Sequence, residues 1–171
     1  MIEQDCKGEK VAVSSKYAGA FDHWQRIKKQ YDIKPIDTER TVCNSELGYA
    51  GTYDLLAEFE GKKCIIDIKT GNNYPVTAGW QMMAYAKALE QEGVHKDLGV
   101  VGIHIKRDGS YGKAWIYQHY DFCWKAFVAT WFAWKGMYFN ELKRMGWKWL
   151  HIDPLEINNG KSEDDRCANL G

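Results

Sequence analysis

Two carboxylates and one amine lie inside the apolar stretch that spans residues 51–70, GTYDLLAEFEGKKCIIDIKT. They belong to Asp54, Asp67 and Lys69. Adjacent carboxylates repel each other unless a cation lies between them, and Mg²⁺ is bound by one or two carboxylates together with phosphate oxygens of a substrate. A nearby lysine suits the same chemistry, because it can hold an attacking water while the metal stabilises charge on the phosphate. The alternative is a solvated sheet face with no chemical role.

The stretch predicts a β-hairpin, and its turn decides which charges meet. If residues 60 and 61 form a two-residue loop, Asp54 lies opposite Asp67; if residues 61 and 62 form it, Asp54 lies opposite Lys69. Either register places all three charges on one face, because opposed residues and residues two apart share a face. A three-residue loop would point Asp54 to the other side. The opposite face carries three apolar residues that we expect to be buried: Cys64, Ile66 and Ile68.

The remaining elements predict an α/β sandwich with a mixed central β-sheet flanked by helices. Residues 1–15 are polar and are expected to have little structure. Helical spacing of apolar residues and turn residues between short strands define the other segments. The expected elements are a helix over 18–31, strands over 38–45, 48–60 and 62–70, a helix over 78–93, a hairpin over 98–120 with an Asp108-Gly109 turn, and a helix capped by Asp121 that ends near Gly146.

Length and composition favour one domain over residues 1–171, with a core at about 17–150 and a polar tail at about 157–171. No apolar run is long enough for a membrane span, and the first residues lack the apolar segment of a secretory signal. We therefore expect a cytoplasmic protein without a membrane partner. With 23 basic and 23 acidic residues the net charge is zero, so a polyanion must be met by a local basic patch.

Five cysteines are scattered along the chain, and no two form a CxxC pair. This pattern argues against a disulfide framework and against a zinc or iron–sulfur site. We expect reduced thiols, some of them in the core.

Glu39 and three short motifs that follow it in a fixed order together resemble the PD-(D/E)XK nuclease superfamily. The motifs are Gly51-Thr52-Tyr53-Asp54, Asp67-Ile68-Lys69-Thr70 and Gln81-Met82-Met83-Ala84-Tyr85. Within the superfamily, the chain is most similar to the RecB-like branch, which includes phage exonucleases and CRISPR-associated nucleases. The likeness covers about residues 36–90 at the level of motifs and, more loosely, the segment to about residue 145. It implies a restriction-endonuclease-like fold.

The resemblance also implies roles for individual residues. Asp54 and Asp67 would bind one or two Mg²⁺ or Mn²⁺ ions, with the backbone carbonyl of Ile68 as a further ligand, and Lys69 would be the catalytic lysine. Gln81 and Tyr85 would line the site and help to position DNA. Four residues apart on a helix, these two side chains share a face; the alternative is a core tyrosine with a glutamine at its rim.

The family often has a further acid or histidine near the metals. Glu39, just before an expected strand, and His23, on the first expected helix, are the candidates, whereas Glu46 lies beside a turn and is expected to be solvated. Some relatives bind an iron–sulfur cluster through four cysteines. This chain lacks that arrangement, so no cluster is expected.

Basic and aromatic residues alternate in the last expected helix. Its aromatic residues follow one helical stripe, which favours packing against the core. The alternative is that some rings stack on bases of a single strand while lysines neutralise phosphates. The DNA-binding candidates are Thr70, Lys106, Arg107, Lys113, Lys125 and Lys135.

Taken with the resemblance, these observations favour a Mg²⁺- or Mn²⁺-dependent deoxyribonuclease. The likeness to phage enzymes of recombination and repair favours exonuclease action on the ends of linear duplex or single-stranded DNA. It leaves open a homo-oligomer or a recombination partner protein, and a phage-encoded protein would act in the host cytoplasm. Two alternatives remain: a nucleic-acid-binding module of the same fold with weak or no catalysis, and a structural domain whose acids are solvated.

Overall fold

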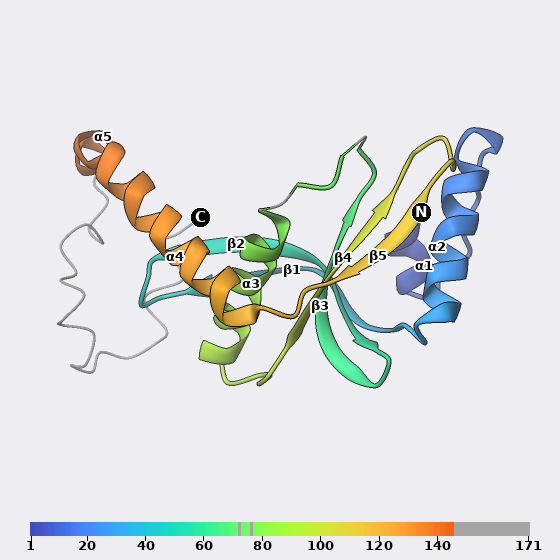
Figure 1. The fold of residues 1–171 in the computed structure, drawn as a ribbon, viewed down its shortest axis with the longest axis horizontal. Helices are drawn as coiled ribbons and strands as arrows, with labels where there is room; N and C mark the ends of the chain where they lie inside the picture. Colours follow the sequence, from blue (N-terminus) through green and yellow to red (C-terminus); the bar gives the residue numbers. More distant parts are fainter. Residues whose placement is uncertain (72, 76, 146–171) are drawn as a thin grey trace.

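The structure is a computed structural model that describes residues 1–71, 73–75 and 77–145. At its centre is a sheet with the strand order β1-β2-β3-β4-β5 (Figure 1). The first three strands form an antiparallel meander, β4 runs parallel to β3, and β5 runs antiparallel to β4. The predicted meander and mixed sheet are therefore confirmed. The strands are β1 (Lys34–Asn44), β2 (Tyr49–Phe59), β3 (Lys62–Lys69), β4 (Gly99–Ile105) and β5 (Gly112–Ile116).

Helices cover both faces of this sheet because its central strands are apolar on both sides. Ile66 and its neighbours on one face pack against α2 (Ala18–Gln30), and Ile65 and its neighbours on the other face pack against α3 (Ala78–Gln91). A short 3₁₀ turn, η1 (Ser15–Tyr17), leads into α2. This arrangement of helices around a mixed five-stranded sheet is the restriction-endonuclease-like fold that was expected.

The chain begins with a short helix, α1 (Ile2–Cys6), where little structure was expected. Asp5 anchors it to α2, since its carboxylate accepts hydrogen bonds of 2.8 Å from the indole N–H of Trp24 and from the amine of Lys28. These hydrogen bonds come from residues about twenty positions away, which is why the local sequence does not reveal the helix.

The last helical segment differs from its prediction. It is divided at Tyr138 into α4 (Tyr120–Met137) and α5 (Phe139–Arg144), and it begins after His119, so Asp121 is not its cap. Asp121 instead forms an exposed ion pair of 2.6 Å with Lys125. The predicted end near Gly146 and the polar tail at 157–171 lie outside the described residues.

The aromatic stripe of α4 packs inward, as the core explanation requires. Trp124, Phe127 and Trp131 lie against the cluster formed by α3 and the adjoining face of the sheet, where Tyr49 meets Phe127 edge to face with ring centroids 4.9 Å apart. Figure 1 shows α4 and α5 at the end of the molecule opposite to α1 and α2. These three rings are therefore part of the packed structure and not a free stacking surface.

Three of the cysteines, Cys6, Cys64 and Cys123, carry free thiols, and Cys43 is disulfide-bonded. The expectation that all cysteines are reduced is therefore wrong for Cys43.

Candidate active site

The β2–β3 hairpin has the register of the first alternative. Phe59 pairs with Lys62, so residues 60 and 61 form a two-residue loop, and both have positive φ (51° and 80°), as a type I′ turn requires. Pairing continues outward to Leu55 and Ile66. Asp54 and Asp67 are the next residues of the two strands, directly after this last pair.

The two strands stop pairing at this point, and the Asp54 side chain accepts the next hydrogen bond from β3. The backbone N–H of Ile68 donates a hydrogen bond of 2.8 Å to Asp54 Oδ2. Because the N–H and C=O of one strand residue project to the same side, the Ile68 carbonyl also projects toward Asp54. The end of the ladder therefore gathers a carboxylate and a carbonyl oxygen in one place.

Asp67 is a buried carboxylate, with only 4% of its surface exposed. The amine of Lys69, two residues along β3, contacts Asp67 Oδ1 at 2.6 Å. The lysine itself is about one third exposed, so its ammonium group lies at the boundary between the buried acid and solvent.

Burial and the neighbouring charges shift the pKa values of Asp54 and Lys69. Burial raises the pKa of Asp54, the hydrogen bond from Ile68 lowers it in part, and the Asp67 charge raises it again. For Lys69, burial is the largest single influence and lowers the pKa, but the hydrogen bond and charge of Asp67, with the charge of Asp54, raise it above the usual value. Lys69 is therefore a cation at neutral pH, held by the acids.

The predicted pair on α3 lies next to this group. The Gln81 side-chain amide donates a hydrogen bond of 2.7 Å to the Tyr85 hydroxyl. Burial raises the pKa of Tyr85, Gln81 lowers it in part, and the Asp67 and Asp54 charges raise it. Gly51 of β2 makes room for the ring, since a Cβ there would lie 2.6 Å from Tyr85 Cε1. Gly51 of the first motif is thus required to make room for Tyr85 of the third motif.

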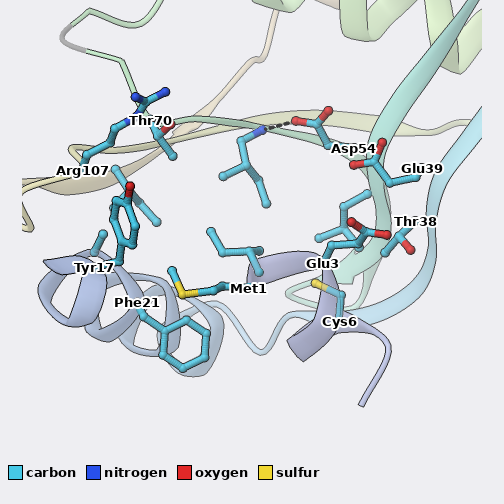
Figure 2. A pocket seen from close by; sticks show the side chains of 15 residues that line it. Met1, Glu3, Cys6, Tyr17, Phe21, Thr38, Glu39, Asp54, Thr70 and Arg107 are labelled. Atoms are coloured by element: carbon cyan, nitrogen blue, oxygen red, sulfur yellow. Dashed lines mark hydrogen bonds between the residues drawn. The ribbon is translucent and has the colours of Figure 1, made fainter. Parts of the chain in front are cut away.

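An open pocket of about 510 Å³ adjoins Asp54 on the α2 side of the sheet (Figure 2). Asp54 and Glu39 lie together at one end, and Arg107 and Thr70 lie together at the other, where the Arg107 guanidinium contacts Thr70 Oγ1 at 3.4 Å. Tyr17 forms part of the wall. The pocket therefore joins an acidic end at the candidate site to a basic end beyond it.

The two candidates for an additional ligand have different positions. Glu39 has an unusual positive φ of 53° within β1, and burial, together with the charge of Asp54, raises its pKa. It is thus brought to the site. His23 is not, because its Nε2 lies 2.8 Å from the carbonyl oxygen of Gly109, at the tip of the β4–β5 hairpin.

The other basic candidates do not gather at the site. Lys125 pairs with Asp121, and the Lys135 amine donates to the carbonyl of Leu47 at 2.6 Å, where burial lowers its pKa. The Lys113 amine lies 4.4 Å from the centre of the Trp115 ring. Lys106 belongs to the hairpin tip, where its backbone N–H bonds to the carbonyl of Tyr111.

One neighbour of the site has no counterpart among the motifs. The Tyr74 hydroxyl lies 3.3 Å from Asp67 Oδ2. Tyr74 stands in the segment between β3 and α3, outside any periodic pattern, so only its place between two of the motifs would have drawn attention to it.

The oxygen donors of the site suit a hard cation. Two carboxylates and a carbonyl fit the preference of Mg²⁺ and Mn²⁺ for a few protein oxygens with water in the remaining positions. Within the described part of the chain, no three His, Cys, Asp or Glu side chains form a group that could hold a metal by themselves. A metal here would therefore rest on Asp54, Asp67 and the Ile68 carbonyl, completed by water or substrate.

Among residues 1–71, 73–75 and 77–145, no helix combines the length and apolar character that crossing a membrane requires.

Two comparisons with known proteins bear on the identity of the site. No curated protein matches the chain. The model of the PD-(D/E)XK nuclease superfamily matches residues 6–131, which include every residue of the three motifs. The chain belongs to the PD-(D/E)XK nuclease superfamily, whose members are nucleases that generally use divalent metals such as Mg²⁺.

Proposed function

We propose that this protein is a Mg²⁺- or Mn²⁺-dependent deoxyribonuclease that removes nucleotides from DNA ends. The observation that carries the proposal is the junction of β2 and β3, where Asp54 accepts the Ile68 N–H and lines an open pocket while the neighbouring Asp67 pairs with Lys69. Membership of the superfamily supports phosphodiester hydrolysis. The preference for ends rests on the likeness to phage exonucleases.

The metal ion would supply a Lewis acid for the phosphate oxygens and lower the pKa of a bound water. Asp54, Asp67 and the Ile68 carbonyl would hold it. The Lys69 ammonium would hydrogen-bond to the attacking water or to a phosphate oxygen at the exposed edge of the buried acid. Its positive charge at neutral pH suits it to stabilise the negative charge that develops as the water oxygen bonds to phosphorus and the bond to the leaving oxygen breaks.

The pocket beside Asp54 gives the substrate backbone a path. Arg107 and Thr70 would contact the phosphate next to the scissile one, because they lie across the pocket from Asp54 (Figure 2). Gln81 and Tyr85 would approach from the α3 side. Glu39 would serve as an additional acid, acting through a water. The other lysines, at positions 106, 113, 125 and 135, would add only modest, salt-sensitive affinity.

In the cell we propose a role in recombination, repair or degradation of DNA, in the cytoplasm, which is the host cytoplasm if a phage encodes the protein. A homo-oligomer or a recombination partner remains a prediction.

A second candidate function is a nucleic-acid-binding module with weak or no catalysis. It is favoured by the ion pair with Lys69 that already neutralises Asp67. It predicts that Lys69→Ala leaves DNA binding and biological activity intact.

The experiment that tests end-directed cleavage compares linear duplex, nicked circular, closed circular and single-stranded DNA, each with Mg²⁺, with Mn²⁺ and with a chelator. Degradation of linear DNA beside intact circles supports the exonuclease. Cleavage of closed circles would contradict end dependence while leaving the nuclease proposal standing, and no cleavage of any substrate, together with DNA binding, would support the binding module.

A further inference from the structure

The buried carboxylate of Asp67 has a different partner on each oxygen. Lys69 Nζ lies 2.6 Å from Oδ1, and the Tyr74 hydroxyl lies 3.3 Å from Oδ2. An ionised carboxylate has about four acceptor sites, so each oxygen keeps acceptor capacity after these contacts. The contact with Tyr74 is long for an O–H···O bond, which usually spans 2.5–3.0 Å; such bonds often shorten when a site is occupied.

The Tyr74 ring occupies a space that a glycine of the neighbouring strand leaves open. Gly102 of β4 pairs with Asp67 in the parallel register, and a Cβ at Gly102 would lie 2.2 Å from the Tyr74 hydroxyl oxygen and 2.4 Å from Cζ. The ring therefore fills the space that a side chain on the neighbouring strand would take. No larger residue at position 102 leaves the hydroxyl where it is.

A second contact fixes the start of the segment that carries Tyr74. His104, two residues after Gly102 and buried, has its Nε2 2.8 Å from the carbonyl oxygen of Gly71. The rings of His104 and Tyr74 are tilted toward each other with centroids 6.0 Å apart. Gly71 and Tyr74 are thus both held beside β4, with the Tyr74 hydroxyl directed at Asp67.

We propose that Tyr74 is a positioning residue that sets the orientation of the Asp67 carboxylate for metal binding. The inference rests on the proposed function, because it assumes that Asp67 is a metal ligand. A hydroxyl that donates to one oxygen while an ammonium holds the other restricts rotation of the carboxylate, so the directions of its remaining acceptor sites are fixed. Loss of such a supporting contact typically weakens metal binding by 10- to 100-fold.

The test measures Mn²⁺ binding by the whole chain without DNA, from the electron paramagnetic resonance signal of free Mn²⁺. Tyr74→Phe removes only the hydroxyl and is expected to weaken Mn²⁺ binding about 10-fold. The matched control is Tyr111→Phe: Tyr111 also lies beside His104, with ring centroids 5.4 Å apart, and within the described part of the chain no hydrogen bond of its hydroxyl is found. The control should bind Mn²⁺ as the wild type does.

Thermal unfolding in metal-free buffer separates orientation from folding. Tyr74→Phe should melt close to the wild type, since the ring remains in place. Gly102→Ala is the second variant; it keeps the hydroxyl but displaces the ring, and it should also weaken Mn²⁺ binding.

Wild-type Mn²⁺ affinity in Tyr74→Phe would overturn the inference and leave the proposed function intact. A wild type that binds no Mn²⁺ would overturn both. An equal loss of affinity in Tyr74→Phe and Tyr111→Phe would also overturn the inference, because it would show a general effect of removing a tyrosine hydroxyl near His104.

Discussion

The backbone N–H of Ile68 donates its hydrogen bond to the Asp54 carboxylate at the point where β2 and β3 stop pairing. This bond holds Asp54 beside the strand that carries Asp67 and Lys69. Burial raises the pKa of Asp54, and the charge of Asp67 contributes to the same rise. The site therefore contains a repulsion between carboxylates that a bound cation would relieve.

Divalent metal should stabilise the wild type and not Asp54→Asn. At a metal concentration about 100 times the dissociation constant, binding contributes roughly 2.7 kcal/mol, which raises Tm by about 5–10 °C in a chain of this size. Differential scanning fluorimetry with Mn²⁺ measures the shift. Glu46→Gln, which removes an exposed acid near the β1–β2 turn, is the control and should shift as the wild type does. Equal shifts in Asp54→Asn and the wild type would remove Asp54 from the metal site.

Without metal, Asp54→Asn should be more stable than the wild type at neutral pH. Because folding raises the pKa of Asp54, the folded state holds its proton more tightly, so the ionised group costs stability once the pH exceeds the usual carboxyl value of 3.8. The advantage of Asp54→Asn should therefore be absent below about pH 3.8 and should grow to a plateau above the raised pKa. Urea unfolding across this range measures it. If Asp54→Asn were most stabilised relative to the wild type at low pH, folding would lower the pKa of Asp54 and the prediction would be wrong.

Lys69 and Asp67 should show strong energetic coupling. Lys69→Met leaves a carboxylate that is only 4% exposed without its cation, which should cost about 1–3 kcal/mol. Adding Asp67→Asn should recover most of this loss, because the second change removes the buried charge. Urea unfolding of the two single variants and the double variant gives the coupling energy. Additive effects would mean that the ion pair is not maintained in solution.

Gly51→Ala should disturb the site through Tyr85. The new Cβ would lie 2.6 Å from the Tyr85 ring, and overpacking of this kind costs about 1–3 kcal/mol. Gly136→Ala in α4 meets no atom within 4 Å and should gain up to about 1 kcal/mol of helix propensity. Denaturant unfolding and nuclease rates of both variants provide the comparison. A Gly51→Ala variant with wild-type stability and rate would separate Tyr85 from the site.

The sequence could predict the parts of the site that depend on local pairing. The two-residue turn at residues 60 and 61 sets the register of the β2–β3 hairpin up to Leu55 and Ile66, and the four-residue spacing sets Gln81 beside Tyr85. Contacts made across the fold could not be read in this way. Tyr74 reaches Asp67 only because Gly102 lies on the strand next to β3, and these residues are far apart in the chain.

Two features of the structure could not be predicted from the local sequence. His23 lies on the predicted helix, but its ring meets the carbonyl of Gly109 on a hairpin that the helix approaches only in the folded chain. The long terminal helix divides at Tyr138, although no proline or glycine stands at that position to indicate a break.

The central claim is metal-dependent hydrolysis of DNA by the residues at the β2–β3 junction. The most direct measurement follows the release of acid-soluble nucleotides from linear duplex DNA by the wild type and by Lys69→Ala, with Mn²⁺ and with a chelator, after circular dichroism has shown that both are folded. We predict that the wild type releases nucleotides with Mn²⁺ but not with the chelator. With Mn²⁺, Lys69→Ala should release them at a rate at least about 100-fold lower. Equal rates for the two proteins, or release that persists in the chelator, would contradict the account.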